Sequence, residues 1–315
     1  MNPVLLKLGP LQVNWYGLLI VGGALLAAWL STHEARRRGE DPEHVWNLLT
    51  WILILGIIGA RAYHVFSTPS GNFAGWAYYR EHPIDIIKFW DGGFRGLGIY
   101  GAILGGVIGV VIYTRLNRLK LLTWLDIVSP GLVLAQAIGR MGNRINQELY
   151  GPPTNLPWAF HINPSFPCQE PVGSPMACGV AERLTAEARQ WYAASGFHPT
   201  FFYEALWNVG GFFLLWFGGR ALSKRLRSGD VFFAYLIWYP VGRFWVELFR
   251  PDAWRMGSLA TAQWIAIGGF TIGVLGILIN HLRPRRAEAE VVPGSDVDAE
   301  VKAEGEVQSE GPLAE

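Results

Sequence analysis

Long apolar stretches separated by short charged segments run through most of the chain. About 20 helical residues are needed to cross the roughly 30 Å hydrocarbon core of a bilayer. Seven stretches approach or reach that length: residues 15–30, 46–66, 97–113, 121–141, 201–219, 231–249 and 258–281. The pattern predicts an all-α polytopic membrane protein with seven transmembrane helices. In the third stretch Gly101, Gly105 and Gly109 are spaced four apart, which predicts close packing against a neighbouring helix.

Basic residues predict the orientation of these helices. Clusters of Lys and Arg follow the first, third, fifth and seventh stretches, within residues 36–38, 115–120, 220–227 and 283–286. With seven spans all four clusters lie on one side, and the enrichment of short cytoplasmic loops in Lys and Arg makes that side the cytoplasm. We expect an N-out, C-in topology. Because the charge follows the first stretch and does not precede it, we expect that stretch to remain as an anchor.

Two longer segments, residues 67–96 and about 142–200, are expected on the outer side. The second is rich in proline and predicts a small extracytoplasmic head. It contains both cysteines of the chain, Cys168 and Cys178. An oxidising compartment permits a disulfide between them, and the sequence leaves that pairing open. We expect one membrane domain, residues 1–282 with the head included, and a disordered acidic cytoplasmic tail, residues 283–315.

Composition narrows the class of protein further. The chain is 51% hydrophobic and 16% charged, whereas a soluble domain carries about 25% charged residues. The net charge is +1, so there is no broad basic field for nucleic acid. A water-soluble enzyme and a nucleic-acid-binding protein are both excluded. No metal or organic cofactor is expected.

Polar residues at membrane depth are the candidates for function, because ionisable groups are costly there. The densest group is at residues 139–151, at the outer end of the fourth stretch. On a helix, Arg140, Asn143 and Asn146 share one face. Arginine offers a planar fork of donors to a phosphate, asparagine adds amide donors, and Glu148 offers a carboxylate. The alternative is an interfacial cluster that only reaches lipid headgroups.

A second polar group is in the sixth stretch. Tyr239, Arg243 and Glu247 are spaced four apart and so share one helix face. Arg243 and Glu247 alone would also make an internal ion pair, although desolvation makes such a pair a poor choice for packing. Other polar residues accompany these groups: Tyr16, Arg61, His64, Tyr100, His198, Tyr203 and Glu204. Together they predict a pocket for an anionic headgroup, open to the outer leaflet.

The chain resembles a known family at these positions. Residues 139–151 meet every fixed position of the prolipoprotein diacylglyceryl transferase signature, G-R-x-G-N-x-x-N-x-E-x-x-G. Further blocks agree in order: Trp15-Tyr16-Gly17, Gly59-Ala60-Arg61, Trp90-x-Gly-Gly, Ile99-Tyr100-Gly101, His198-Pro199-Thr200-x-x-Tyr203-Glu204 and Tyr239-x-x-x-Arg243-Phe244-x-x-Glu247-x-x-Arg250. The resemblance covers about residues 10–282.

The resemblance implies a defined reaction in the bacterial cytoplasmic (inner) membrane, with the active site toward the extracytoplasmic side. Members of the family move the diacylglyceryl group of phosphatidylglycerol onto the thiol of a lipobox cysteine in a preprolipoprotein signal peptide. A thioether forms and glycerol 1-phosphate leaves, which is the first step of bacterial lipoprotein maturation. The implied partners are phosphatidylglycerol, the lipobox substrates and membrane lipids, and no nucleic acid.

The expected roles follow from this reaction. Arg140 and Arg243 hold the phosphate and stabilise its developing charge. Glu148 and Glu247 orient these arginines, and either is also a candidate to accept the thiol proton. The remaining substrate-binding or catalytic candidates are Asn143, Asn146, Gly151, Tyr16, Arg61, Tyr100 and Tyr239.

Two other functions remain as alternatives. A transporter for an anion would also place arginine in membrane helices, but it favours internal repeats, which this sequence lacks. A non-catalytic lipid-binding scaffold would bind phosphatidylglycerol without releasing glycerol phosphate. A retinal-type receptor is excluded, because residues 258–281 contain no lysine for a Schiff base.

Overall fold

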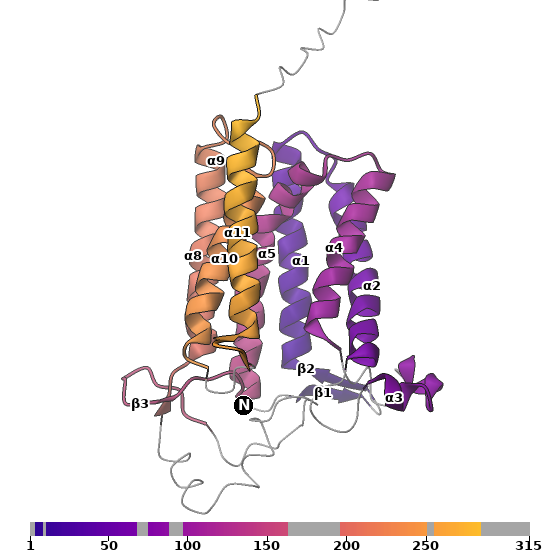
Figure 1. Cartoon of the computed structure of the whole chain (residues 1–315), viewed down its shortest axis with the longest axis vertical. Coiled ribbons are helices and arrows are strands. Elements are labelled where there is room, and N and C mark those ends of the chain that lie inside the picture. Colours follow the sequence, from indigo (N-terminus) through magenta and orange to yellow (C-terminus); the bar gives the residue numbers. More distant parts are fainter. Residues whose placement is uncertain are drawn as a thin grey trace, which may run out of the picture. The chain divides into compact units, whose positions relative to one another are not determined.

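The computed structural model describes residues 4–8, 11–67, 75–87, 97–162, 196–250 and 255–284, and they are mostly helical. Every predicted apolar stretch is largely helical, although the last begins in a strand, at residues 259–260, before its helix (Figure 1). These segments are α1 (Trp15–Arg37), α2 (Glu43–Phe66), α4 (Ile99–Leu116), α5 (Leu121–Asn146), α8 (Thr200–Phe213), α10 (Asp230–Glu247) and α11 (Thr261–Leu282). Among the described helices, α1, α2, α4, α5 and α11 are long and apolar enough to cross a membrane. The chain is therefore a polytopic membrane protein.

The fifth stretch differs from a plain α-helix. After α8 the backbone continues as a π-helical segment, η2 (Leu214–Gly218), and ends in α9 (Gly219–Ala221). A π-helical turn differs from an α-helical turn in its backbone hydrogen bonds, and the spacing of apolar side chains does not reveal that difference. The predicted helix therefore has the right position but a different internal geometry.

Short elements outside the long helices modify the predicted all-α class. Three antiparallel strand pairs join β1 (Val4–Leu8) to β2 (Leu11–Asn14), β3 (Pro153–Thr154) to β4 (Gly196–Phe197), and β5 (Arg255–Met256) to β6 (Leu259–Ala260). A short helix, α3 (Trp76–Tyr79), and a 3₁₀ turn, η1 (Pro83–Ile86), lie between α2 and α4. Cys168 and Cys178, most of the predicted head and most of the predicted tail lie outside the described residues.

The end of α1 lies beyond the predicted boundary at residue 30. The helix continues to Arg37 because buried Glu34 neutralises the charges that arrive there. Glu34 pairs with Arg37 at 2.5 Å, with Arg38 at 2.8 Å and with Arg220, from α9, at 3.2 Å. Basic residues that the sequence placed in a loop therefore belong to the last turn of the helix and the residue after it.

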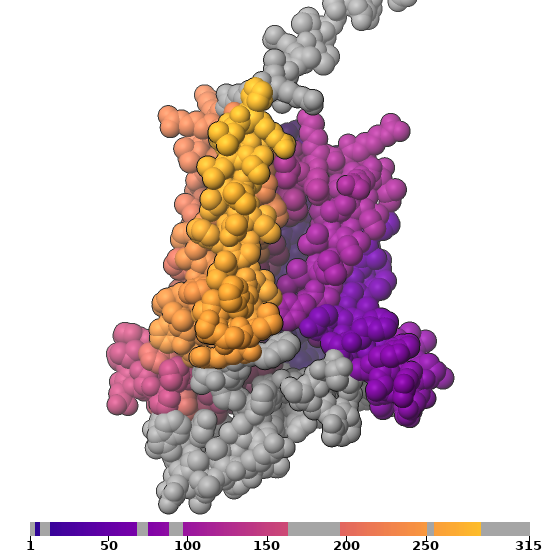
Figure 2. Space-filling view, viewed as in Figure 1, coloured from indigo at the N-terminus to yellow at the C-terminus, as the bar shows by residue number. Residues whose placement is uncertain are grey.

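Helix α5 lies between two groups of helices, α1, α2 and α4 on one side and α8, α10 and α11 on the other (Figure 1). One apolar core surrounds Trp124 and Ile127 of α5, and a second surrounds Val133 of the same helix. On the outside, α4 and α11 expose large apolar side chains, as expected of surfaces that face lipid, and Figure 2 shows both helices on one face.

A buried aspartate in α5 and the glycines of α4 explain how these helices pack together. Buried Asp126 of α5 accepts hydrogen bonds from the backbone N–H groups of Gly229 and Phe232, at 2.8 and 2.9 Å, and so caps the first turn of α10. The predicted close packing of the glycines in α4 is confirmed. A Cβ atom at Gly109 would lie 3.0 Å from the carbonyl oxygen of Trp51 in α2, so only glycine lets the backbones approach this closely.

Candidate functional site

Two arginines from different helices converge on one carboxylate. Arg140 of α5 pairs with Oε1 of Glu204, on α8, at 2.5 Å. Arg243 of α10 pairs with Oε2 of the same side chain at 3.3 Å. Glu204 is buried, with 3% of its surface exposed, whereas the arginine side chains keep 22% and 16% of theirs. The site therefore holds two partly accessible guanidinium groups on a buried anion.

The ion-pair network continues along α10. Arg243 also pairs with Glu247 at 2.7 Å, and Glu247 pairs with Arg250 at 3.6 Å. Arg140 and Arg243 remain partly exposed, whereas the carboxylates that hold them are buried. In a low-dielectric interior, guanidinium groups that remain accessible attract an anion strongly. The arrangement can therefore bind a phosphate group through arginine donors that are already positioned.

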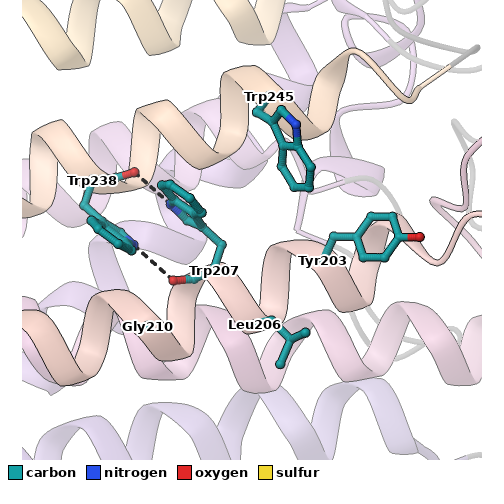
Figure 3. Close-up of a pocket in the computed structure, with 6 residues that line it drawn as sticks. All are labelled: Tyr203, Leu206, Trp207, Gly210, Trp238 and Trp245. Carbon is teal, nitrogen blue, oxygen red and sulfur yellow. Dashed lines mark hydrogen bonds between the residues drawn. The ribbon is translucent and has the colours of Figure 1, made fainter.

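The Trp207–Trp238 pair fixes the spacing between α8 and α10 close to this network. The two indole rings stack with their centroids 4.5 Å apart, and each Nε1–H donates to the other residue's backbone carbonyl at 3.0 Å (Figure 3). The rings border an aromatic groove of about 400 Å³, also lined by Tyr203 and Trp245. Tyr203 is next to Glu204 in α8, and Trp245 is two residues from Arg243 in α10. The aromatic packing therefore lies beside the ion pair and sets the separation of the two helices that carry it.

The signature segment ends in a constrained turn. Gln147 and Leu149 both have left-handed backbone conformations, with φ of 54° and 55°, which are uncommon for residues other than glycine. The hydroxyl of Thr200 donates to the carbonyl of Leu149, and the N–H of Glu148 donates to the carbonyl of Asn143 at 3.0 Å. Glu148 is thus held between two strained residues, in a place fixed by α5 and α8.

The side chain of Glu148 has partners other than those expected from the sequence. Its Oε1 accepts hydrogen bonds from the amides of Asn143, at 2.8 Å, and Asn146, at 3.2 Å. In the described part of the chain, Glu204 and Glu247 pair with the site arginines, and Glu148 does not. Two glutamates were expected to orient the arginines. Glu247 does pair with Arg243, whereas Glu148 accepts hydrogen bonds from the side-chain amides of two asparagines.

Three tyrosines surround the arginines. The ring of Tyr16 packs on Gly142, where any Cβ atom would overlap it. Tyr16 interacts electrostatically with Arg140 and Glu148, and Tyr239 also interacts with Arg140. Tyr100, at the start of α4, interacts electrostatically with Arg243. The structure therefore brings these candidates from α1, α4 and α10 to one region.

Gly151 and Arg61 have mainly structural surroundings. A Cβ atom at Gly151 would lie 2.9 Å from Thr200 and 3.0 Å from His198, and the Gly151 N–H donates to the carbonyl of His198 at 2.8 Å. The guanidinium of Arg61 donates to the carbonyls of Ile86, at 2.7 Å, and Asp85. These bonds tie α2 to η1, and the guanidinium of Arg61 also lies over the ring of Tyr79, 5.1 Å from its centroid.

Comparison with known proteins identifies the family of this chain. Residues 3–279 match the family model described as prolipoprotein diacylglyceryl transferase. The chain belongs to this family. Three relatives named phosphatidylglycerol–prolipoprotein diacylglyceryl transferase span nearly the same length. The protein of Trichormus variabilis is 37% identical over 287 residues, 90% of this chain and 91% of the relative. That of Pediococcus pentosaceus is 37% identical, with 91% and 92% covered. That of Chloroflexus aggregans is 38% identical, with 91% of both covered.

Membership of the prolipoprotein diacylglyceryl transferase family confirms the resemblance that residues 139–151 carry. The structure gives Glu204 and Arg250 places in the ion-pair network, whereas the sequence put Glu204 in the predicted pocket without a role and offered Arg250 only in a matching block. The available signal for Glu204 was a carboxylate within an apolar stretch with no basic residue one helical turn away. Such a residue needs a cation from another helix, and α5 and α10 supply it.

Proposed function

We propose that this chain transfers the diacylglyceryl group of phosphatidylglycerol to the thiol of the lipobox cysteine in a preprolipoprotein. A thioether forms and glycerol 1-phosphate leaves. The convergence of Arg140 and Arg243 on Glu204 carries the proposal, because it creates a preorganised anion site in a member of this transferase family. The names of the relatives support the choice of lipid and acceptor.

The arginines act on the charge that develops during the reaction. The thiol sulfur attacks the glyceryl carbon next to the phosphate oxygen, and the carbon–oxygen bond breaks with its electron pair passing to the phosphate. A diester with one negative charge becomes a monoester that gains a second. Arg140 and Arg243 stabilise that second charge more than the first, so they lower the barrier as well as binding the lipid.

Glu148 is the group we assign to accept the thiol proton. Its described partners are neutral amides, whereas Glu204 and Glu247 are paired with arginines. The thiolate is the reactive form of cysteine, and the nearby positive charge favours it. Asn143 and Asn146 hold the carboxylate in place, and Tyr16, Tyr100 and Tyr239 position the headgroup. Gly151 and Arg61 support the walls of the site.

We further propose that seven helices cross the bacterial inner membrane, N-out and C-in, with the site toward the extracytoplasmic side. The distribution of Lys and Arg supports this orientation. Helices α8, η2 and α9 run without a break from residue 200 to 221, about 33 Å at 1.5 Å per residue, which matches the hydrocarbon thickness. Helix α10 then returns the chain to the side of Arg243 and Glu204.

Transfer of a labelled diacylglyceryl group to a lipobox peptide tests the proposal. Purified Arg243→Ala protein is expected to lose transfer by about 100-fold or more, because its charge acts on the transition state. The matched control is Arg220→Ala, which removes an ion pair with Glu34 at the opposite end of the bundle and keeps the site. Full transfer by a normally folded Arg243→Ala protein would falsify the charge-stabilising role.

A further inference from the structure

The contacts between α5 and α8 define a register that continues below the ion-pair network. Arg140 faces Glu204, and a Cβ atom at Gly211 would lie 3.3 Å from Cγ2 of Val133. From the first contact to the second, the residue number falls by seven in α5 and rises by seven in α8. The two helices are therefore antiparallel, and each residue of α5 has a counterpart at the same level of α8. Four residues from the ion pair, this register puts Gln136 of α5 and Asn208 of α8 at the same level along the helices.

This second level of polar residues has unmet hydrogen bonds. Asn208 is completely buried, and among the described residues neither its Nδ2 nor its Oδ1 has a hydrogen-bond partner. Gln136 donates from Nε2 to the hydroxyl of Tyr235 at 2.9 Å, and its Oε1 has no partner in the same part of the chain. An unpaired buried amide is destabilising, and an apolar residue of the same shape would remove that cost. We therefore expect a bound ligand to supply the missing hydrogen-bond partner of these two side chains.

The depth of the pair indicates which part of a lipid reaches it. Four residues of helix place Asn208 about 6 Å from the level of Glu204, toward the middle of α8. A phosphoglyceride held by its phosphate at Arg140 and Arg243 points its acyl chains in that direction, and its ester linkages come first. A Cβ atom at Gly139, three residues from Gln136 on the same face of α5, would meet nothing within 4 Å, so this face has open space.

We propose that Asn208 determines specificity by donating a hydrogen bond from Nδ2 to an ester carbonyl of the bound diacylglyceryl group. The second hydrogen of the same Nδ2 turns toward Oε1 of Gln136, and Tyr235 holds Gln136 in place. This inference rests on the proposed function, because it takes the lipid phosphate to lie at the arginines. An ester carbonyl accepts a hydrogen bond, whereas an ether linkage has no carbonyl to offer.

The test compares phosphatidylglycerol with ester-linked chains and phosphatidylglycerol with ether-linked chains of equal length. Wild-type protein in nanodiscs is expected to transfer from the ester lipid about three- to tenfold faster than from the ether lipid, as one neutral hydrogen bond implies. Asn208→Leu is expected to lose that preference by slowing with the ester lipid alone. The variant is also expected to unfold at a temperature no lower than the wild type, since it removes two unpaired polar atoms.

Controls separate the possible failures. Trp124→Phe removes another unpaired buried N–H in the other apolar core, and it is expected to keep the ester preference. Gln136→Leu provides a second variant if Asn208→Leu does not fold. Equal wild-type rates with the two lipids overturn the inference, as does an equal loss with both in Asn208→Leu, which would indicate a structural water. Wild-type protein that transfers from neither lipid refutes the proposed function, and this inference with it.

Discussion

Replacing Glu204 with glutamine removes the charge that Arg140 and Arg243 share while it keeps the shape of the side chain. In the described structure Glu204 is the carboxylate paired with Arg140, whereas Arg243 keeps Glu247 as a partner. The substitution therefore removes the acidic partner that the described structure gives Arg140, whereas Arg243 still pairs with Glu247. It also makes the net charge of the network more positive by one.

The magnitude follows from the burial of the pair. Removing one partner of a buried ion pair costs about 3–5 kcal/mol, and the 22% exposure of the Arg140 side chain puts the expected loss of stability near the lower end, about 3 kcal/mol. Displacement of the Arg140 guanidinium by about 1 Å is expected to reduce transfer by about 100-fold.

Thermal unfolding and diacylglyceryl transfer, measured on the same nanodisc preparations, separate these two effects. In the double variant Glu204→Gln/Arg140→Gln the stranded charge is gone, so stability is expected to recover while transfer stays low. Glu34→Gln is the matched control, because it breaks a buried arginine cluster at the other end of α1 and is expected to lower stability without changing kcat of the folded fraction. Wild-type transfer by folded Glu204→Gln would show that the shared carboxylate does not position the arginines.

Two further substitutions test the surroundings of the network. Glu148→Gln is expected to reduce kcat by about 10²–10⁴-fold and to shift the pH profile of kcat, because it removes the proton acceptor; an unchanged profile would exclude that role. Gly142→Val is expected to displace the ring of Tyr16, at a cost of about 1–3 kcal/mol in stability and with a raised KM for the lipid, and wild-type kinetics in this variant would contradict the placement of Tyr16.

The helices were predictable because each depends mainly on the length and hydrophobicity of its own stretch of sequence. An apolar stretch of sufficient length forms a helix, and the glycines of α4 mark its contact with α2. The extension of α1 to Arg37 was not predictable from hydropathy, since it depends on Glu34 pairing with Arg220, which lies 186 residues away. The π-turn of η2 was missed because it changes only the backbone hydrogen bonds.

The site shows the same division between local and distant information. Residues 139–151 identified Arg140, Asn143 and Glu148 as a group, since they are close in sequence. The hydrogen bonds of Glu148 to Asn143 and Asn146 are also local, but they depend on the left-handed turn at Gln147 and Leu149, which the residue pattern does not reveal. The joint role of Glu204 depends on the packing of α8 against both α5 and α10, which no spacing within one helix encodes.

In the proposed mechanism the arginine network catalyses transfer and does not merely bind an anionic lipid. The mass balance of a reaction between purified protein, phosphatidylglycerol and a lipobox peptide tests this directly. We expect thioether-linked diacylglyceryl peptide and glycerol 1-phosphate in equal amounts, with neither formed by Arg140→Ala protein. Tight binding of phosphatidylglycerol with no release of glycerol 1-phosphate would contradict it and identify a lipid-binding scaffold.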